Sequence, residues 1–106
     1  MKLKKVIRQK FRDEVFKRDN YQCVFCDETE NLDAHHITDR NEMPNGGYVK
    51  ENGISLCNKH HMHAEIFHIT NGKEWVNNMH PDDLYKLIHS SFDKAVEKSN
   101  QLKDNM

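Results

Sequence analysis

The sequence predicts a small α+β domain that is stabilised by a structural metal ion and has a helix at each end. Two short-spaced ligand pairs, Cys23-x2-Cys26 and Cys57-x2-His60, are separated by thirty residues. Apolar residues recur at helical spacing near both ends of the chain, whereas the short apolar segments between them suit strands. Only 36% of the 106 residues are hydrophobic. Such a chain buries a limited core, so a bound metal ion would help it to fold.

Each expected element follows from a local pattern within a single domain, residues 1–106. Ile7, Phe11 and Val15 predict a helix over residues 6–18, within a basic N-terminal segment 1–18. The core, residues 19–70, should hold short strands at 31–37 and 54–57, joined by a loop rich in glycine and asparagine. Asn58 is the expected cap of a helix over 59–69. A last helix is expected over 81–100. Its apolar stripe comprises Leu84, Leu87, Ile88, Phe92, Ala95 and Val96.

The three cysteines and one histidine of the two pairs favour a closed zinc site. An odd number of cysteines would leave one thiol outside any set of intramolecular disulfides. Three thiolates and an imidazole complete a tetrahedral Cys3His site with no open position, which is typical of structural zinc. His61, next to His60, could compete for the ion. Reduced cysteines and the lack of a signal-like or membrane-spanning apolar run predict a cytoplasmic protein that is not in a membrane.

A second group of ligands predicts an open metal site. His35 and His36 lie on one short strand, where consecutive side chains point to opposite faces. On the following helix, His61 and Glu65 are four residues apart and share a face, with His68 nearby, whereas His63 should face solvent. Imidazole and carboxylate groups with vacant positions are typical of a catalytic metal site.

Several of these motifs, in this order, resemble the HNH endonuclease family. They are "DAHHI", the Gly46-Gly47 pair, "ENGISLC" and "LCNKHH", and together they cover about residues 18–68. The paired ligands are similar to those of the zinc-stabilised subgroup, with His60 where a cysteine is usual. The resemblance implies a ββα-metal fold, here flanked by an N-terminal and a C-terminal helix.

The resemblance also implies roles for single residues. His35 and His61 would be ligands of a catalytic divalent metal, and His36 would be the general base that activates water. Asn52 would brace the loop and hold the backbone of His36. Glu65 stands where the family often has a third histidine ligand, and His68 is the substitute if Glu65 faces away.

The implied activity is metal-dependent hydrolysis of DNA, giving 5′-phosphate and 3′-hydroxyl ends. Nitrogen ligands suit Mn²⁺, Ni²⁺ or Zn²⁺ better than Mg²⁺, so the choice among these four stays open. The alternatives are a cleavage-inactive, zinc-stabilised nucleic-acid-binding module, and an interaction protein that docks through its last helix. By resemblance, the setting would be a phage-infected or bacterial cell, and a protein partner could supply sequence specificity. The sequence leaves the oligomeric state open.

Charge is distributed unevenly, so the small net charge says little about binding to a polyanion. The net charge is −1, but residues 1–18 carry +6 and residues 19–74 carry −6. A solvated helix face is the simpler explanation of the basic segment. If duplex DNA is the substrate, its phosphates would meet Lys4, Lys5, Arg8, Arg12, Arg40 and Lys50.

Overall fold

The computed structural model describes residues 2–102, with side chains from residue 4. Within this range the chain forms four α-helices and one two-stranded antiparallel sheet, the expected α+β class. In chain order the elements are α1 (Lys2–Arg18), β1 (Asp33–His36), β2 (Gly53–Leu56), α2 (Asn58–Ile69), α3 (Pro81–Leu87) and α4 (Phe92–Asn100). The loop expected between the strands contains three 3-10 turns: η1 (Arg40–Glu42), η2 (Pro44–Gly47) and η3 (Lys50–Asn52). No described helix is long and apolar enough to span a bilayer.

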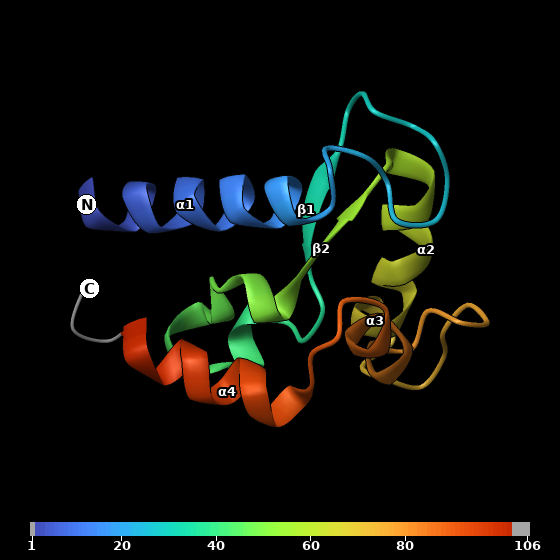
Figure 1. Ribbon diagram of the computed structural model, residues 1–106. Helices are drawn as coiled ribbons and strands as arrows, with labels where there is room; N and C mark the ends of the chain where they lie inside the picture. Colours follow the sequence, from blue (N-terminus) through green and yellow to red (C-terminus); the bar gives the residue numbers. More distant parts are fainter. Residues whose placement is uncertain (1, 103–106) are drawn as a thin grey trace.

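The sheet lies between α1 and α2, as Figure 1 shows. Its register pairs Asp33 with Leu56 and His36 with Gly53. Helix α1 packs against this sheet through the buried side chains of Phe11 and Val15. A Cβ atom at Gly53 would lie 2.6 Å from Val15 Cγ2 and 2.7 Å from Phe11 Cε1, so the close approach of α1 requires glycine there.

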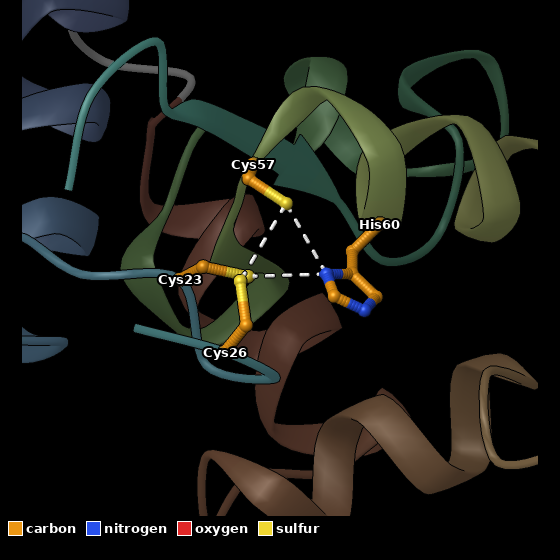
Figure 2. Close-up of side chains that lie close together, drawn as sticks. All are labelled: Cys23, Cys26, Cys57 and His60. Atoms are coloured by element: carbon orange, nitrogen blue, oxygen red, sulfur yellow. Dashed lines mark hydrogen bonds between the residues drawn. The ribbon is translucent and has the colours of Figure 1, made fainter. Parts of the chain in front are cut away.

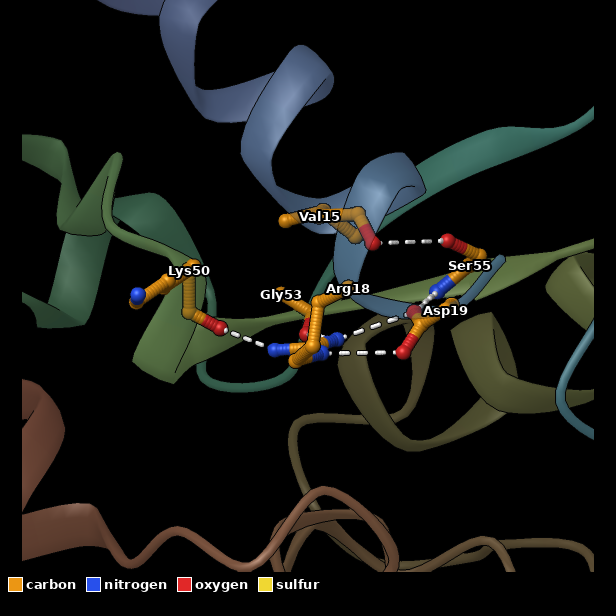
Figure 3. A network of polar contacts seen from close by, with 6 residues as sticks. All are labelled: Val15, Arg18, Asp19, Lys50, Gly53 and Ser55. Atoms are coloured by element: carbon orange, nitrogen blue, oxygen red, sulfur yellow. Dashed lines mark hydrogen bonds and ion pairs between the residues drawn. The ribbon is translucent and has the colours of Figure 1, made fainter. Parts of the chain in front are cut away.

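A polar network fixes the end of α1 to β2, as Figure 3 shows. The guanidinium of Arg18 donates to the backbone carbonyls of Lys50 and Gly53, each at 2.6 Å, and pairs with Asp19 at 2.9 Å. Asp19 Oδ2, which accepts from Arg18 Nη2, also accepts from the backbone N–H of Ser55 at 2.9 Å. Arg18 therefore serves the fold, because its donors are engaged by the chain itself.

The prediction of one continuous last helix is wrong, because the chain forms α3 and α4 with a break between them. His89 adopts a left-handed conformation with φ of 56°, and the Ser91 side chain caps α4 by accepting from the backbone N–H of Lys94. Leu84 is buried, but Leu87 and Phe92 remain 46% and 48% exposed, so they do not form one apolar stripe. The polar residues His89, Ser90 and Ser91 before α4 favour the start of a new helix over continuation of α3.

Two other boundaries differ from expectation. Helix α1 starts at Lys2, four residues before the predicted start, because the apolar pattern that marks a helix does not extend into its lysine-rich first turn. Helix α2 has Cys57 at its N-cap position, where Asn58 was expected, since Asn58 is already helical. This shift places Cys57 at the junction of β2 and α2.

Candidate functional site

The three cysteines and His60 come together at one point, as Figure 2 shows. Cys23 and Cys26 lie in the turn that follows α1, and Cys57 and His60 lie at the start of α2. Their four ligand atoms are all within 4.8 Å of one another, and the cysteines are free thiols. The cluster could hold a metal ion.

The spacing of these atoms fits tetrahedral zinc. Ordinary Zn–S and Zn–N bond lengths place two sulfur ligands about 3.8 Å apart and a sulfur and a nitrogen about 3.6 Å apart. The Sγ atoms of Cys26 and Cys57 are 3.8 Å apart. His60 Nδ1 lies 3.6 Å from Cys23 Sγ and 3.2 Å from Cys57 Sγ. Four donors at these distances close the coordination sphere, so the cluster fits a structural ion.

The local electrostatics favour the metal-binding forms of Cys57 and His60. The backbone N–H of His60, followed by smaller contributions that include the N–H of Lys59, lowers the pKa of the Cys57 thiol despite its burial. A thiolate is the form that binds metal. Burial lowers the pKa of His60 and favours the neutral imidazole, which is also the metal-binding form. The Phe25 ring stacks on His60 with centroids 5.4 Å apart and fixes its orientation.

His35, Glu65 and His68 form the second cluster, with ligand atoms within 4.8 Å of one another. Glu65 faces this cluster: its Oε2 lies 3.3 Å from His35 Nδ1 and 3.8 Å from His61 Nε2. Glu65 and His68 are therefore both present, although the sequence suggested them as alternatives. The pKa of Glu65 is lowered chiefly by its hydrogen bond with His35, so Glu65 is ionised.

Asp33 belongs to the same face and was missed by the sequence argument. Its Oδ2 lies 3.4 Å from His61 Nδ1, so His61 stands between two carboxylates, Asp33 and Glu65. Strand alternation could have found Asp33, because it lies two residues before His35 on β1. His61 thus turns away from the cysteines, which leaves His60 as their partner. His63 is partly exposed and lies in neither cluster.

His36 points to the opposite side of β1 from His35. Its ring stacks on Phe11 and meets Tyr48 edge-on, in each case with centroids 4.7 Å apart. Nε2 of His36 is buried without a hydrogen-bond partner. Burial, with smaller effects from the nearby charges of His35 and Arg40, lowers the pKa of His36 to about 4. His36 is therefore neutral at pH 7 and has an unused nitrogen.

One cavity of about 240 Å³ connects His36 with the second cluster. It lies at the end of β1, between the loop that follows the strand and helix α2. Its lining comprises Ala34, His35, His36, Asp39, Arg40, Tyr48, His61, Glu65 and His68. The predicted metal ligands and the predicted base thus share a single hollow, although they approach it from opposite faces of the strand.

Asn52 is fully buried and braces the backbone around this cavity. Its Nδ2 donates to the carbonyls of Thr38 and Gly47, and its Oδ1 accepts from the backbone N–H of Thr38. The brace therefore holds Thr38, two residues after His36, and not the backbone of His36 itself. The Tyr85 hydroxyl also donates to Asn52 Oδ1 at 2.7 Å. This contribution from α3 was missed, because nothing local to Tyr85 indicates its partner.

Three of the six cations predicted to meet DNA share one cavity, and the other three lie at separate places. Lys4, Arg8 and Arg40 line one cavity of about 360 Å³. Lys5 is exposed on α1, and the guanidinium of Arg12 lies 5.2 Å from the Phe16 ring centroid. Lys50 lines separate hollows beside Glu51.

Comparisons with protein-family models, curated proteins and solved structures found no match for this chain. The resemblance to HNH endonucleases therefore rests on the spaced motifs of the sequence alone. The function must be inferred from the chemistry of the site.

Proposed function

We propose that this protein is a metal-dependent DNA endonuclease with HNH-type chemistry. One observation carries the proposal: a neutral histidine and a cluster of metal-ligand side chains line the same cavity. Hydrolysis of a phosphodiester needs a proton acceptor for the attacking water and positive charge near the phosphate. His36 and the His35–Glu65–His68 cluster supply these two functions.

His35, Glu65 and His68 would hold a divalent ion, with His61 close to the shared Glu65 carboxylate. Three ligands leave positions for water and substrate, which suits a working site. When bound, such an ion polarises the scissile phosphate and stabilises the departing 3′ oxygen. The imidazole ligands favour Mn²⁺, Ni²⁺ or Zn²⁺ over Mg²⁺. Asp33 orients His61 through Nδ1 and leaves Nε2 facing Glu65.

His36 would accept the proton of the attacking water. A pKa of about 4 keeps its imidazole unprotonated at pH 7, but it also makes His36 a weak base in the free protein. Burial and the charges of His35 and Arg40 cause the low value. A phosphate bound beside Arg40 would offset part of that charge and raise the pKa of His36.

Asn52 acts by positioning, because its four hydrogen bonds go to other parts of the chain. It holds Thr38 and Gly47 in place; Thr38 directly precedes Asp39 and Arg40, and Gly47 directly precedes Tyr48. The expected products are a 5′-phosphate and a 3′-hydroxyl.

Plasmid nicking with Mg²⁺, Mn²⁺ or Ni²⁺ tests this proposal. His36→Ala should lower the rate by about 10²- to 10⁴-fold, the usual contribution of a general base. His63→Ala is the matched control, because it removes a histidine of α2 outside the cavity and should cut normally. Equal cutting by wild type and His36→Ala would overturn the base assignment. If wild type cuts with none of these ions and yet retards DNA, the cleavage-inactive binding module is the correct function.

A further inference from the structure

A second hollow lies next to the proposed active site and is lined by cations from two parts of the chain. We call it the basic groove; it has a volume of about 360 Å³. Helix α1 contributes Lys4 and Arg8, and the loop between the strands contributes Arg40. The complete lining is Lys4, Ile7, Arg8, Arg40, Asn41, Asn45, Gly46 and Tyr48.

No salt bridge of the described residues neutralises the cations of the basic groove, and Asp39 makes only a minor contribution to the raised pKa of Arg40. Its lining contains three cations, two asparagine amides and no carboxylate. Among the described residues, neither Lys4, Arg8 nor Arg40 forms an ion pair with an acidic side chain. Arg18, by contrast, is paired with Asp19 and bonded to the backbone. Unpaired cations gathered in a concave surface favour an anionic ligand.

Tyr48 lies beside two of these cations. The Arg8 guanidinium lies over its ring, 5.5 Å from the centroid. Tyr48 is also the main cause of the raised pKa of Arg40, so these two side chains lie close together. The tyrosine thus lies beside an arginine of α1 and an arginine of the loop. Two arginines presented in this way match the oxygen atoms of a phosphate.

The basic groove adjoins the cavity of the proposed active site, because Arg40 and Tyr48 line both hollows. The Tyr48 ring centroid is 4.7 Å from that of His36 and 5.5 Å from the Arg8 guanidinium. Arg8 is therefore at most about 10 Å from the His36 ring. One DNA strand carries a phosphate about every 3.4 Å along the helix axis. Because the strand also winds around that axis, the distance spans at most about three nucleotides.

We infer that the basic groove binds the phosphodiester backbone of the DNA strand within about three nucleotides of the bond that is cut. This inference rests on the proposed nuclease function for the position of the cut, but binding itself can be measured without cleavage. Backbone contacts of this kind fix the position of the strand and carry no sequence information. They would guide the scissile phosphate into the cavity beside His36.

Binding of a labelled short duplex to the zinc-loaded protein, with no other divalent metal added, tests the inference by fluorescence anisotropy across a salt series. Arg8→Gln and Lys4→Gln should each weaken binding about fivefold and reduce the salt slope by about one. Lys17→Gln is the matched control. Lys17 is exposed on the same helix, nine positions after Arg8, and lies on the opposite side of α1.

Equal losses of affinity in all three variants would mean that DNA is attracted diffusely to α1, and would contradict binding in the basic groove. Wild-type binding by Arg8→Gln and Lys4→Gln would overturn it as well. If the wild-type protein does not cut DNA, but only the Arg8 and Lys4 variants lose affinity, the basic groove is confirmed as a binding site and the proposed nuclease function is wrong.

A second experiment uses cleavage to locate the contact. Duplexes in which one phosphate is replaced by a neutral methylphosphonate should be cut less by wild type within three nucleotides on one side of the replacement. Arg8→Gln should show no such local loss, because the contact is already absent. A local loss of the same size in both proteins would assign that phosphate to another residue and contradict the inference.

Discussion

Tyr85 joins α3 to the loop that surrounds the proposed active site, and removal of its hydroxyl should loosen that loop. The Tyr85 hydroxyl lies 2.7 Å from both Asn52 Oδ1 and Thr38 Oγ1. Because Asn52 Oδ1 can only accept, Tyr85 donates to it and accepts from the Thr38 hydroxyl. Burial raises the pKa of Tyr85 to about 12, so the phenol remains a donor throughout the working range of pH.

The cost of Tyr85→Phe follows from the partners that it leaves. The ring is buried and phenylalanine fills the same space, so no cavity forms. Asn52 Oδ1 retains the backbone N–H of Thr38 at 3.0 Å, and the half-buried Thr38 hydroxyl can turn toward water. Two hydrogen bonds are lost without a fully orphaned group, which costs about 1–2 kcal/mol. A domain of this size loses about 5 °C in Tm for each kcal/mol.

Thermal unfolding of the zinc-loaded protein, followed by circular dichroism, measures this effect. Tyr21→Phe is the control, because Tyr21 is 58% exposed and its hydroxyl makes no hydrogen bond within the described chain. A double-mutant cycle of Tyr85→Phe with Thr38→Val should show coupling of at least about 0.5 kcal/mol. If Tyr85→Phe is as stable as Tyr21→Phe, the hydroxyl does not hold the Asn52 brace, and the reasoning about this network is wrong.

Three further outcomes are expected. Cys57→Ser, or zinc removal by a chelator, should unfold the protein, because structural zinc contributes on the order of 10 kcal/mol. If circular dichroism shows a folded protein and metal analysis finds no zinc in it, the assignment of a structural zinc site is wrong. The pKa of half-buried His36 is lowered to about 4, so as pH falls below about 6.5 the unfolded chain binds a proton that the folded chain does not, and stability drops by up to about 3 kcal/mol between pH 6.5 and 4. The free energy of unfolding of His36→Phe, measured with denaturant, should lack this part of the acid sensitivity. If wild type and His36→Phe depend on pH identically, the lowered pKa of His36 is wrong. Gly47→Ala should cost more than about 1 kcal/mol in denaturant unfolding, because φ is +67° and the new Cβ would lie 2.7 Å from Asn52 Nδ2. Gly72→Ala has similar φ but a nearest neighbour at 3.2 Å, so it should cost less.

Local patterns predicted the parts of the fold that short-range chemistry determines. The i, i+3 spacing of Cys57 and His60 gives two ligands on one helical turn, whatever the rest of the chain does. Strand alternation correctly separated His35 from His36 by face. The break after Leu87 was missed because the apolar spacing continues across it, whereas the Ser91 cap and the left-handed His89 decide the backbone.

Long-range partners could not be predicted in the same way. The Tyr85 hydroxyl meets an amide 33 positions earlier, and Arg18 donates to carbonyls 32 and 35 positions later. These contacts depend on how the helices pack on the sheet, which a single sequence does not specify. Glu65 shows the same limit: its spacing from His61 indicated a shared helix face, but only packing against β1 places its carboxylate beside His35.

Helix α2 links the two clusters. Cys57 and His60 fix its first turn to the cysteine turn, and the next residue, His61, points away from the thiols toward Glu65. Since neighbouring helical residues differ by about 100°, a zinc-bound His60 also fixes the direction of His61, Glu65 and His68 on the adjacent face. The closed site therefore sets the rotation of the helix about its axis. That rotation decides whether the second cluster converges on His35, so an ion bound by the cysteine cluster at one end of α2 would maintain the proposed working site along its length.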